Sequence, residues 1–209
     1  MAVFKLRSDL ENYKTLHVKD IVLGDDSKGI DYRLFLGAER IGDRWIPPEL
    51  VYFEDFASRD SIENPPGDAA MNDAKAKVPG DFPYLWTGTC PVLSQKAFSS
   101  LHEILAPSVE FLEVTSPQGN FVAFKVLNIL DAIDVSRSEI TWAKRLPKMG
   151  GEFEFIRSFK HLAFHDDRLG NAMIFRVPQL PLHNELFVAQ AFVDLVENAG
   201  LKGFAFQKL

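Results

Sequence analysis

The sequence predicts an α+β fold, in which a mixed or antiparallel sheet is flanked by amphipathic helices. Residues 121–130 form a near-continuous apolar run, which is typical of a strand in the centre of a sheet. Apolar residues at helical spacing occur on both sides of this run along the chain. Because the apolar faces of such a strand must be buried, we expect the two helices to pack against it in one α+β unit.

The first predicted helix follows Ser94, whose hydroxyl suits the N-cap position. Pro107 ends this helix. Its buried stripe is predicted to comprise Phe98, Leu101, Ile104 and Leu105. A strand at residues 109–114 and a turn at residues 116–120 then lead to the central strand.

The second predicted helix covers Phe187–Ala199, and Gly200 is placed to end it in the left-handed conformation. A final strand at residues 201–206 follows. The helical face is predicted to comprise Val188, Phe192, Leu195, Val196 and Ala199.

Three sections are expected along the chain. Residues 1–57 form an N-terminal α+β section, with short strands at residues 21–23 and 32–36. Residues 58–80 are rich in proline and acids and are expected to form a loop or linker. Residues 81–209 form the main α+β domain; the alternative is one continuous domain, 1–209.

The acidic residues are concentrated in one segment. Seven acids and a single base, Arg59, lie between Glu49 and Asp73, and they account for the whole formal net charge of −6. The sequence has no cluster of basic residues that could bind the phosphates of a nucleic acid, which argues against nucleic acid as a ligand. A basic protein partner fits better, and a solvated acidic loop is the alternative. The candidate contact residues here are Glu54, Asp55, Asp60 and Glu63.

Cysteine content and hydropathy point to the cytoplasm. Cys90 is the only cysteine, so no intrachain disulfide can form, and a reducing compartment is expected. The first residues are charged and lack the apolar core of a signal peptide. No apolar run reaches the roughly 18 residues of a membrane span. We expect Cys90 to be a buried structural residue.

Two pairs of residues could in principle carry chemistry. His161 and His165 are four apart, but we expect strands at Phe159–Phe164 and Met173–Val177 that form a hairpin, with the turn between them. Residues four apart on a strand lie about 13 Å from each other, so they cannot share one metal ion. Asp131 and Asp134 could act as paired carboxylates, although capping of a turn explains them better. No metal or cofactor is expected.

Several motifs resemble a known family when they are taken in order. They are Arg7–Tyr13, Asp81–Pro83, Pro91–Ser94, Val126–Asp134 with Ser138, Ile174–Pro178, and the terminal helix, glycine and strand. From about Ser8 to Leu209 the chain is similar to the eleventh family of immunity proteins of bacterial polymorphic toxin systems.

This resemblance implies a protein that binds a cognate toxin delivered between bacteria and neutralises it without being an enzyme. The acidic segment is one candidate contact surface. The predicted hairpin is the other, through His165, Asp166, Asp167 and Arg168. The alternatives are a hydrolase that uses Asp131/Asp134 or His161/His165, and a small-ligand or scaffold protein.

Overall fold

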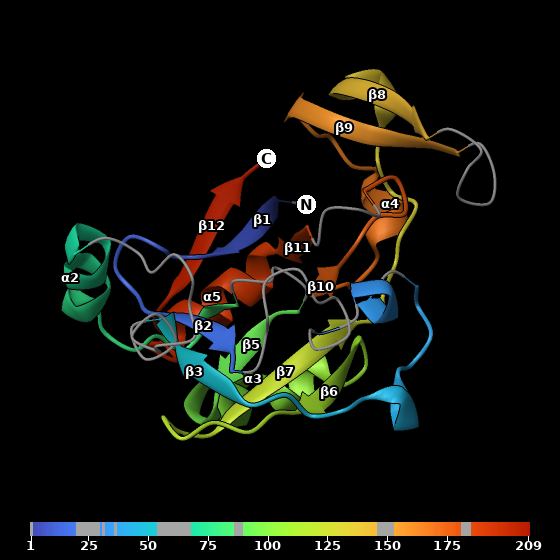
Figure 1. Cartoon of the computed structure of the whole chain (residues 1–209). Coiled ribbons are helices and arrows are strands. Elements are labelled where there is room, and N and C mark those ends of the chain that lie inside the picture. The colour runs from blue at the N-terminus through green and yellow to red at the C-terminus, as the bar shows by residue number, and fades with distance from the viewer. Residues whose placement is uncertain are drawn as a thin grey trace.

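The computed structural model describes residues 2–19, 30, 32–35, 37–53, 68–85, 90–145, 153–180 and 185–209. Within these ranges the chain combines helices with several small sheets, in which the strands are mostly antiparallel (Figure 1). The predicted α+β class, with mixed or antiparallel sheets and flanking helices, is confirmed. The segment 21–23 and the acids Glu54, Asp55, Asp60 and Glu63 lie outside the described residues.

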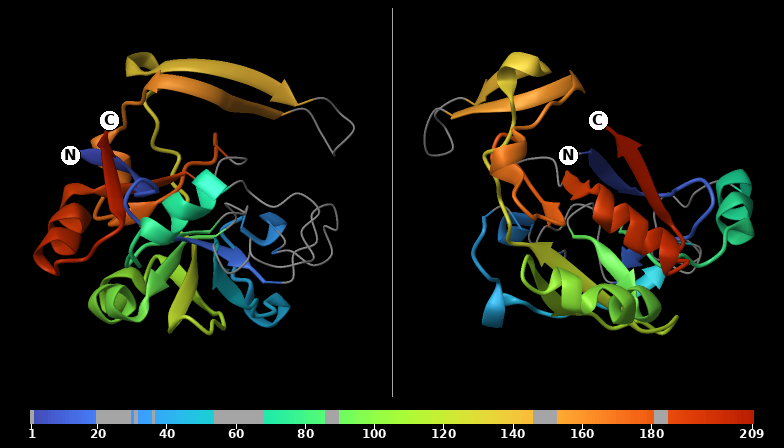
Figure 2. Two further views of the ribbon diagram at one scale, coloured as in Figure 1. Left: turned by 60° about the vertical axis from the view of Figure 1, so that its left-hand side comes forward. Right: turned by 180° about the vertical axis from the view of Figure 1, so that it is seen from behind.

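The first sheet joins the two ends of the chain. Its strands, all antiparallel to their neighbours, run in the order β10 (Ile174–Phe175), β11 (Leu186–Ala189), β1 (Val3–Ser8) and β12 (Phe204–Lys208). The N-terminal strand β1 therefore lies between two C-terminal strands, and both termini lie on the same side of the molecule (Figure 2). This pairing supports the undivided alternative, and we propose that residues 1–209 form one continuous domain.

The second sheet has the predicted central strand in its middle. Its order is β5 (Val92–Ser94), β7 (Phe121–Val126) and β6 (Val109–Glu113), with β7 antiparallel to both neighbours. The strand ends at Val126, earlier than the apolar run does. Helix α3 (Gln95–Leu105) begins directly after β5, and the Ser94 hydroxyl accepts a hydrogen bond from the Ala97 amide at 3.1 Å. The predicted N-cap is confirmed.

A third sheet, β3 (Leu50–Tyr52), β2 (Thr15–Val18) and β4 (Tyr84–Leu85), contains one parallel pair, β2 with β4. Two expectations for this half of the chain are wrong. The predicted strand at residues 32–36 is replaced over its described part, Tyr32–Phe35, by a 3-10 helix, η1, in which Phe35 is buried and its carbonyl accepts a hydrogen bond from Arg176. Helix α2 (Asp68–Ala76) forms inside the segment 58–80 that we expected to be a loop.

Helix α5 (Gln190–Asn198) begins later than predicted. Residues Leu186–Ala189 pair with β1 as strand β11, so the helical phase starts at Gln190. The buried residues are consequently Phe192, Val193 and Val196, whereas Leu195 and Ala199 pack only partly buried at the edge of the core. Gly200 has a φ of +59°, which confirms it as the left-handed residue that ends the helix.

The main core lies between the first two sheets. It is formed by residues of α3 and α5 together with β1, β7 and β11, and residues such as Leu101, Phe124, Val188 and Phe192 are almost completely buried in it. Strand β7 and both amphipathic helices thus share one apolar cluster, as the spacing of apolar residues predicts.

The predicted hairpin between Phe159–Phe164 and Met173–Val177 is wrong. Strand β9 (Phe153–His161) pairs with β8 (Glu139–Arg145) instead, and β10 pairs with β11. The β8–β9 hairpin extends above the rest of the molecule (Figures 1 and 2). The aromatic residues that suggested a local hairpin meet in a core cluster, where the Phe164 ring lies 5.7 Å from Phe175 and 5.4 Å from Phe187.

Candidate functional site

Three of the predicted contact residues, Asp166, Asp167 and Arg168, lie on one short helix, and the fourth, His165, directly precedes it. Helix α4 (Asp166–Leu169) follows His165, and the side chains of Asp166, Asp167 and Arg168 are exposed. Leu169, by contrast, is only 2% exposed and anchors the helix in the core. The turn that follows is made at Gly170, where φ is +52°. The helix therefore presents a charged outer face on a fixed apolar base.

The turn at Asp134 contacts the residues that directly precede α4. The Asp134 carboxylate accepts hydrogen bonds from the Ser136 amide at 3.0 Å, the Ser136 hydroxyl at 2.6 Å and the Arg137 Nε at 2.5 Å. The bond to Ser136, followed by that to Arg137, holds the pKa of Asp134 well below its usual range. His165 Nδ1 lies 3.8 Å from the same carboxylate.

Further hydrogen bonds tie this turn to the segment before and within α4. Arg137 donates to the Phe164 carbonyl at 2.8 Å, and Arg168 donates to the Asp131 carbonyl at 3.0 Å. The Ser138 hydroxyl accepts from the Ala163 amide at 2.9 Å. Segments 131–138 and 163–168 are consequently joined by side-chain hydrogen bonds at several points.

The two acids proposed for paired catalysis have different environments. Asp134 caps the 3-10 helix η3 (Val135–Arg137), and its oxygens are engaged by neighbouring donors. Asp131 is exposed, and its carboxylate accepts from Gln179 at 2.5 Å. Since the lowered pKa keeps Asp134 ionised, this carboxylate is suited to hold the turn rather than to donate a proton.

His161 and His165 belong to different elements. His161 is the last residue of β9, and His165 is the residue before α4. Within the described residues, no group of three or more His, Cys, Asp or Glu side chains has a geometry that could hold a metal ion. Cys90 is buried in the core around β2 and β3, as expected for a structural cysteine.

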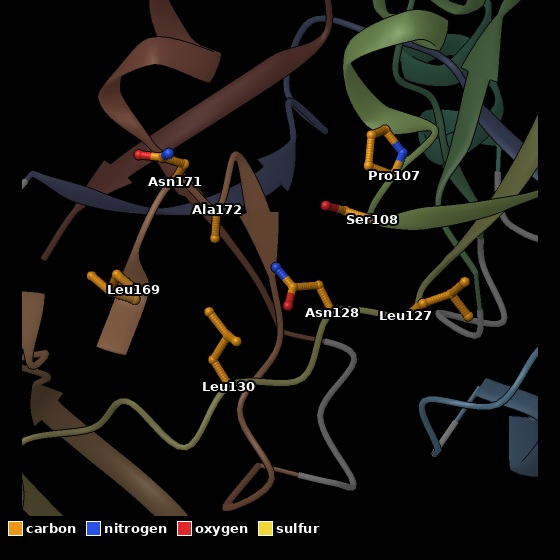
Figure 3. A pocket seen from close by; sticks show the side chains of 8 residues that line it. All are labelled: Pro107, Ser108, Leu127, Asn128, Leu130, Leu169, Asn171 and Ala172. Carbon is orange, nitrogen blue, oxygen red and sulfur yellow. The ribbon is translucent and has the colours of Figure 1, made fainter. Parts of the chain in front are cut away.

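Two hollows adjoin α4 on different sides. The larger, about 460 Å³, lies between the end of α3, the chain after β7, and the residues that follow α4 (Figure 3). The smaller, about 320 Å³, is lined by residues that include Arg137, His161, Asp166 and Lys208. The larger hollow could not be predicted from the sequence, because its polar residues Ser108, Asn128 and Asn171 lie in three separate segments.

The part of the acidic segment that the structure describes is paired with bases. Lys19 donates to the Glu49 carboxylate at 2.6 Å, and Lys77 lies 2.8 Å from Asp73. These two acids are therefore partly neutralised locally, and any excess negative potential of the segment comes from its other acids.

Comparison with known proteins gives one family match, and it lies in the C-terminal half, which contains α4, the Asp134 turn and most of the larger hollow. Residues 112–209 match the model of the immunity protein family (Imm11). No match was found among curated proteins. No helix of the described residues is long and apolar enough to cross a membrane. The resemblance to this immunity family is therefore confirmed over residues 112–209.

Proposed function

We propose that this protein is an immunity protein that binds a cognate protein toxin and neutralises it by occupying its surface, without turnover of its own. The observation that carries the proposal is the match of residues 112–209 to the immunity family, together with the position of α4 inside that segment. The match supports a binding role.

The surface we propose for contact is centred on α4. Asp166, Asp167 and Arg168 are exposed there, while the Asp134 turn and Leu169 fix the backbone beneath them. A rigid backbone lowers the entropy lost on binding, so exposed side chains on it can recognise a partner at small cost. The predicted contact residues His165, Asp166, Asp167 and Arg168 thus remain our candidates.

The acidic segment is the second contact region that we propose. Glu54, Asp55, Asp60 and Glu63 carry charge that would attract a toxin with a basic surface, mainly by raising the association rate. The cytoplasm is the compartment in which we expect the encounter, because a single cysteine, Cys90, is consistent with a reducing compartment.

A hydrolase that uses Asp131 and Asp134 is less well supported. Asp134 accepts hydrogen bonds from both Ser136 and Arg137, so its oxygens are committed to the turn. We therefore favour binding over catalysis.

The experiment is co-expression of the chain with the toxin domain encoded beside its gene. Survival of the cells, together with a complex between the purified proteins, would support the proposal; toxicity unchanged by the chain would contradict it. Neutral replacement of Glu54, Asp55, Asp60 and Glu63 should slow association, most visibly at low salt.

A charge reversal tests α4 separately. Asp167→Lys alters an exposed residue of α4, and Glu197→Lys makes the same change on an exposed position of α5 as a matched control. We expect weaker toxin binding from the first variant alone. Equal binding by both variants would remove α4 from the contact surface.

A further inference from the structure

We propose that two copies of this chain associate through the outer edge of strand β8, which pairs in antiparallel orientation with β8 of the second copy. The two β8–β9 hairpins then form one continuous sheet, in the order β9–β8–β8–β9. This association goes beyond the proposed function and does not depend on the toxin. It rests on the position of β8 in the fold, on the exposure of Trp142 and on the order of charges along the strand.

Strand β8 has one edge that faces away from the rest of the molecule. Within the described residues its sheet consists of β8 and β9 alone, and Figures 1 and 2 show β9 between β8 and the body of the chain. Strand β9 is held to that body, because Ile156 is completely buried and its amide donates to the Gln179 carbonyl at 2.8 Å. The main-chain N–H and C=O groups along the outer edge of β8 can therefore pair with another strand.

This outer edge is regular along the whole length of β8. The register between β8 and β9 shifts at two points. At both points the additional residue belongs to β9, Lys160 at the first shift and Arg157 at the second. Because a bulge bends the strand that contains the additional residue, β8 keeps the even spacing that pairing with a further strand requires.

Strand β8 exposes an aromatic residue at its centre. Trp142 is the fourth of the seven residues and is 41% exposed, although it lies opposite the buried Ile156. Glu139, Thr141 and Lys144 are exposed as well. Burial of the Trp142 ring would stabilise an association. A hairpin of two strands is marginally stable by itself, so each hairpin also gains stability from a wider sheet.

Symmetry restricts the register that two β8 strands can adopt. Two identical antiparallel strands in one sheet are related by a two-fold axis perpendicular to that sheet, which keeps each side chain on its own face. Paired residues must then come from the same face, so their positions differ by an even number of residues. Among such registers, only the one centred on Trp142 pairs all seven residues of β8.

In this register the charges at the two ends of β8 are complementary. Glu139 begins the strand and Arg145 ends it, so Glu139 of each copy lies opposite Arg145 of the partner subunit. Opposite charges directly across a strand pair are stabilising, and like charges are destabilising. A parallel arrangement in the same register would oppose Glu139 to Glu139 and Arg145 to Arg145. The order of charges therefore favours the antiparallel pair.

Glu139 is available for this contact, whereas the other described charge of β8 is already paired. Lys144 lies 3.2 Å from Glu154 on the adjacent strand. Glu139 is exposed and belongs to no ion pair among the described residues. A second copy supplies a base opposite Glu139 and an aromatic ring opposite Trp142 at the same time, which is why we assign this edge to a second copy.

The test measures self-association of the full chain by sedimentation equilibrium. We expect a dimer with a dissociation constant below about 1 mM, as for a small and transient interface. Glu139→Arg and Arg145→Glu each oppose like charges at both ends of the pair and should weaken dimerisation about fivefold or more. The double variant Glu139→Arg/Arg145→Glu restores opposite charges and should dimerise as the wild type does. Glu103→Arg, the same charge change at an exposed position of α3, is the control and should have no effect.

Tryptophan fluorescence gives a second measurement of the same interface. The emission of the wild-type chain should shift to shorter wavelength as its concentration rises, because Trp142 leaves water when the dimer forms. Trp142→Thr, which keeps a residue suited to a strand, should abolish both the shift and the dimer.

Three outcomes decide between the alternatives. A chain that stays monomeric at about 1 mM would overturn the inference and leave the proposed function standing. A dimer that Glu139→Arg and Arg145→Glu leave unchanged forms through another surface, which would also overturn the inference. A chain that dimerises as expected but binds no toxin domain would support the inference and contradict the proposed function.

Discussion

Replacement of Lys125 tests an unusual feature of the core, a buried cation near the C-terminal end of β7. Lys125 is only 2% exposed, lies opposite Glu110 in the β6–β7 register, and donates to the Glu39 carbonyl. Burial lowers the pKa of Lys125, and the negative charge of Glu110 opposes that shift. The strand is in the centre of its sheet, so no rearrangement brings the ammonium group to water cheaply.

Lys125→Met is expected to lower the free energy of unfolding substantially. Loss of the charge-assisted hydrogen bond to Glu39 accounts for about 1.5–3 kcal/mol. Glu110 also loses a nearby cation while its carboxylate stays buried, which brings the expected total to about 3–5 kcal/mol. Lys75→Met, at an exposed position of α2, is the control and should change stability by less than about 0.5 kcal/mol.

A double-mutant cycle of Lys125→Met and Glu110→Gln, with the free energy of unfolding measured in urea, separates the interaction between the two charges from the loss of packing at each site. Glu110 accepts hydrogen bonds from the Ile41 amide at 2.5 Å and the Gly42 amide at 3.0 Å, so Glu110→Gln should itself be costly. The double variant should lose clearly less stability than the two single losses added together, because it leaves neither charge alone. An unchanged midpoint for Lys125→Met, or strict additivity, would refute the reasoning.

Two further predictions concern the helix α5 and the Asp134 turn. Phe192→Ala should lower the free energy of unfolding by about 3–5 kcal/mol, because the ring is buried. Leu195→Ala, at a half-buried position, should lower it by at most about 2 kcal/mol. Equal losses for the two variants in urea unfolding would contradict the observed helical phase. Asp134 has a lowered pKa in the folded state, so as the pH falls this carboxylate takes up a proton in the unfolded chain before it does so in the folded protein. Its contribution to stability is present above an unfolded pKa of about 3.9 and is lost as the pH falls toward the folded pKa. Urea midpoints of Asp134→Asn should therefore fall less steeply below about pH 5 than those of the wild type, and parallel curves would count against this.

Local chemistry made several elements predictable. The Ser94 hydroxyl and the left-handed Gly200 mark helix ends through interactions within a few residues, so the sequence contains all the information that they need. The segment Leu186–Ala189 was misassigned because its apolar pattern continues the stripe of the helix that follows. Only its pairing with β1, at the opposite end of the chain, makes it a strand.

Non-local pairing also explains the error at the hairpin. Strand β9 finds its partner in β8, and the Asp166–Leu169 segment has the composition of a turn but closes into a helix over the buried Leu169. Buried charges such as Lys125 and Glu110 were not foreseen, because charged residues are normally placed at the surface unless a partner is known. Predicted contact residues 165–168 did come together, since they are consecutive in the chain.

Amide hydrogen exchange of the chain, with and without the toxin domain encoded beside its gene, tests the central claim most directly. We expect the toxin to slow exchange at residues 165–172, which comprise α4 and the residues on either side of it, and to leave α2 unchanged. A complex that forms without slowed exchange at 165–172 would contradict the proposed surface. Identical exchange everywhere, with no complex formed, would contradict the immunity function itself.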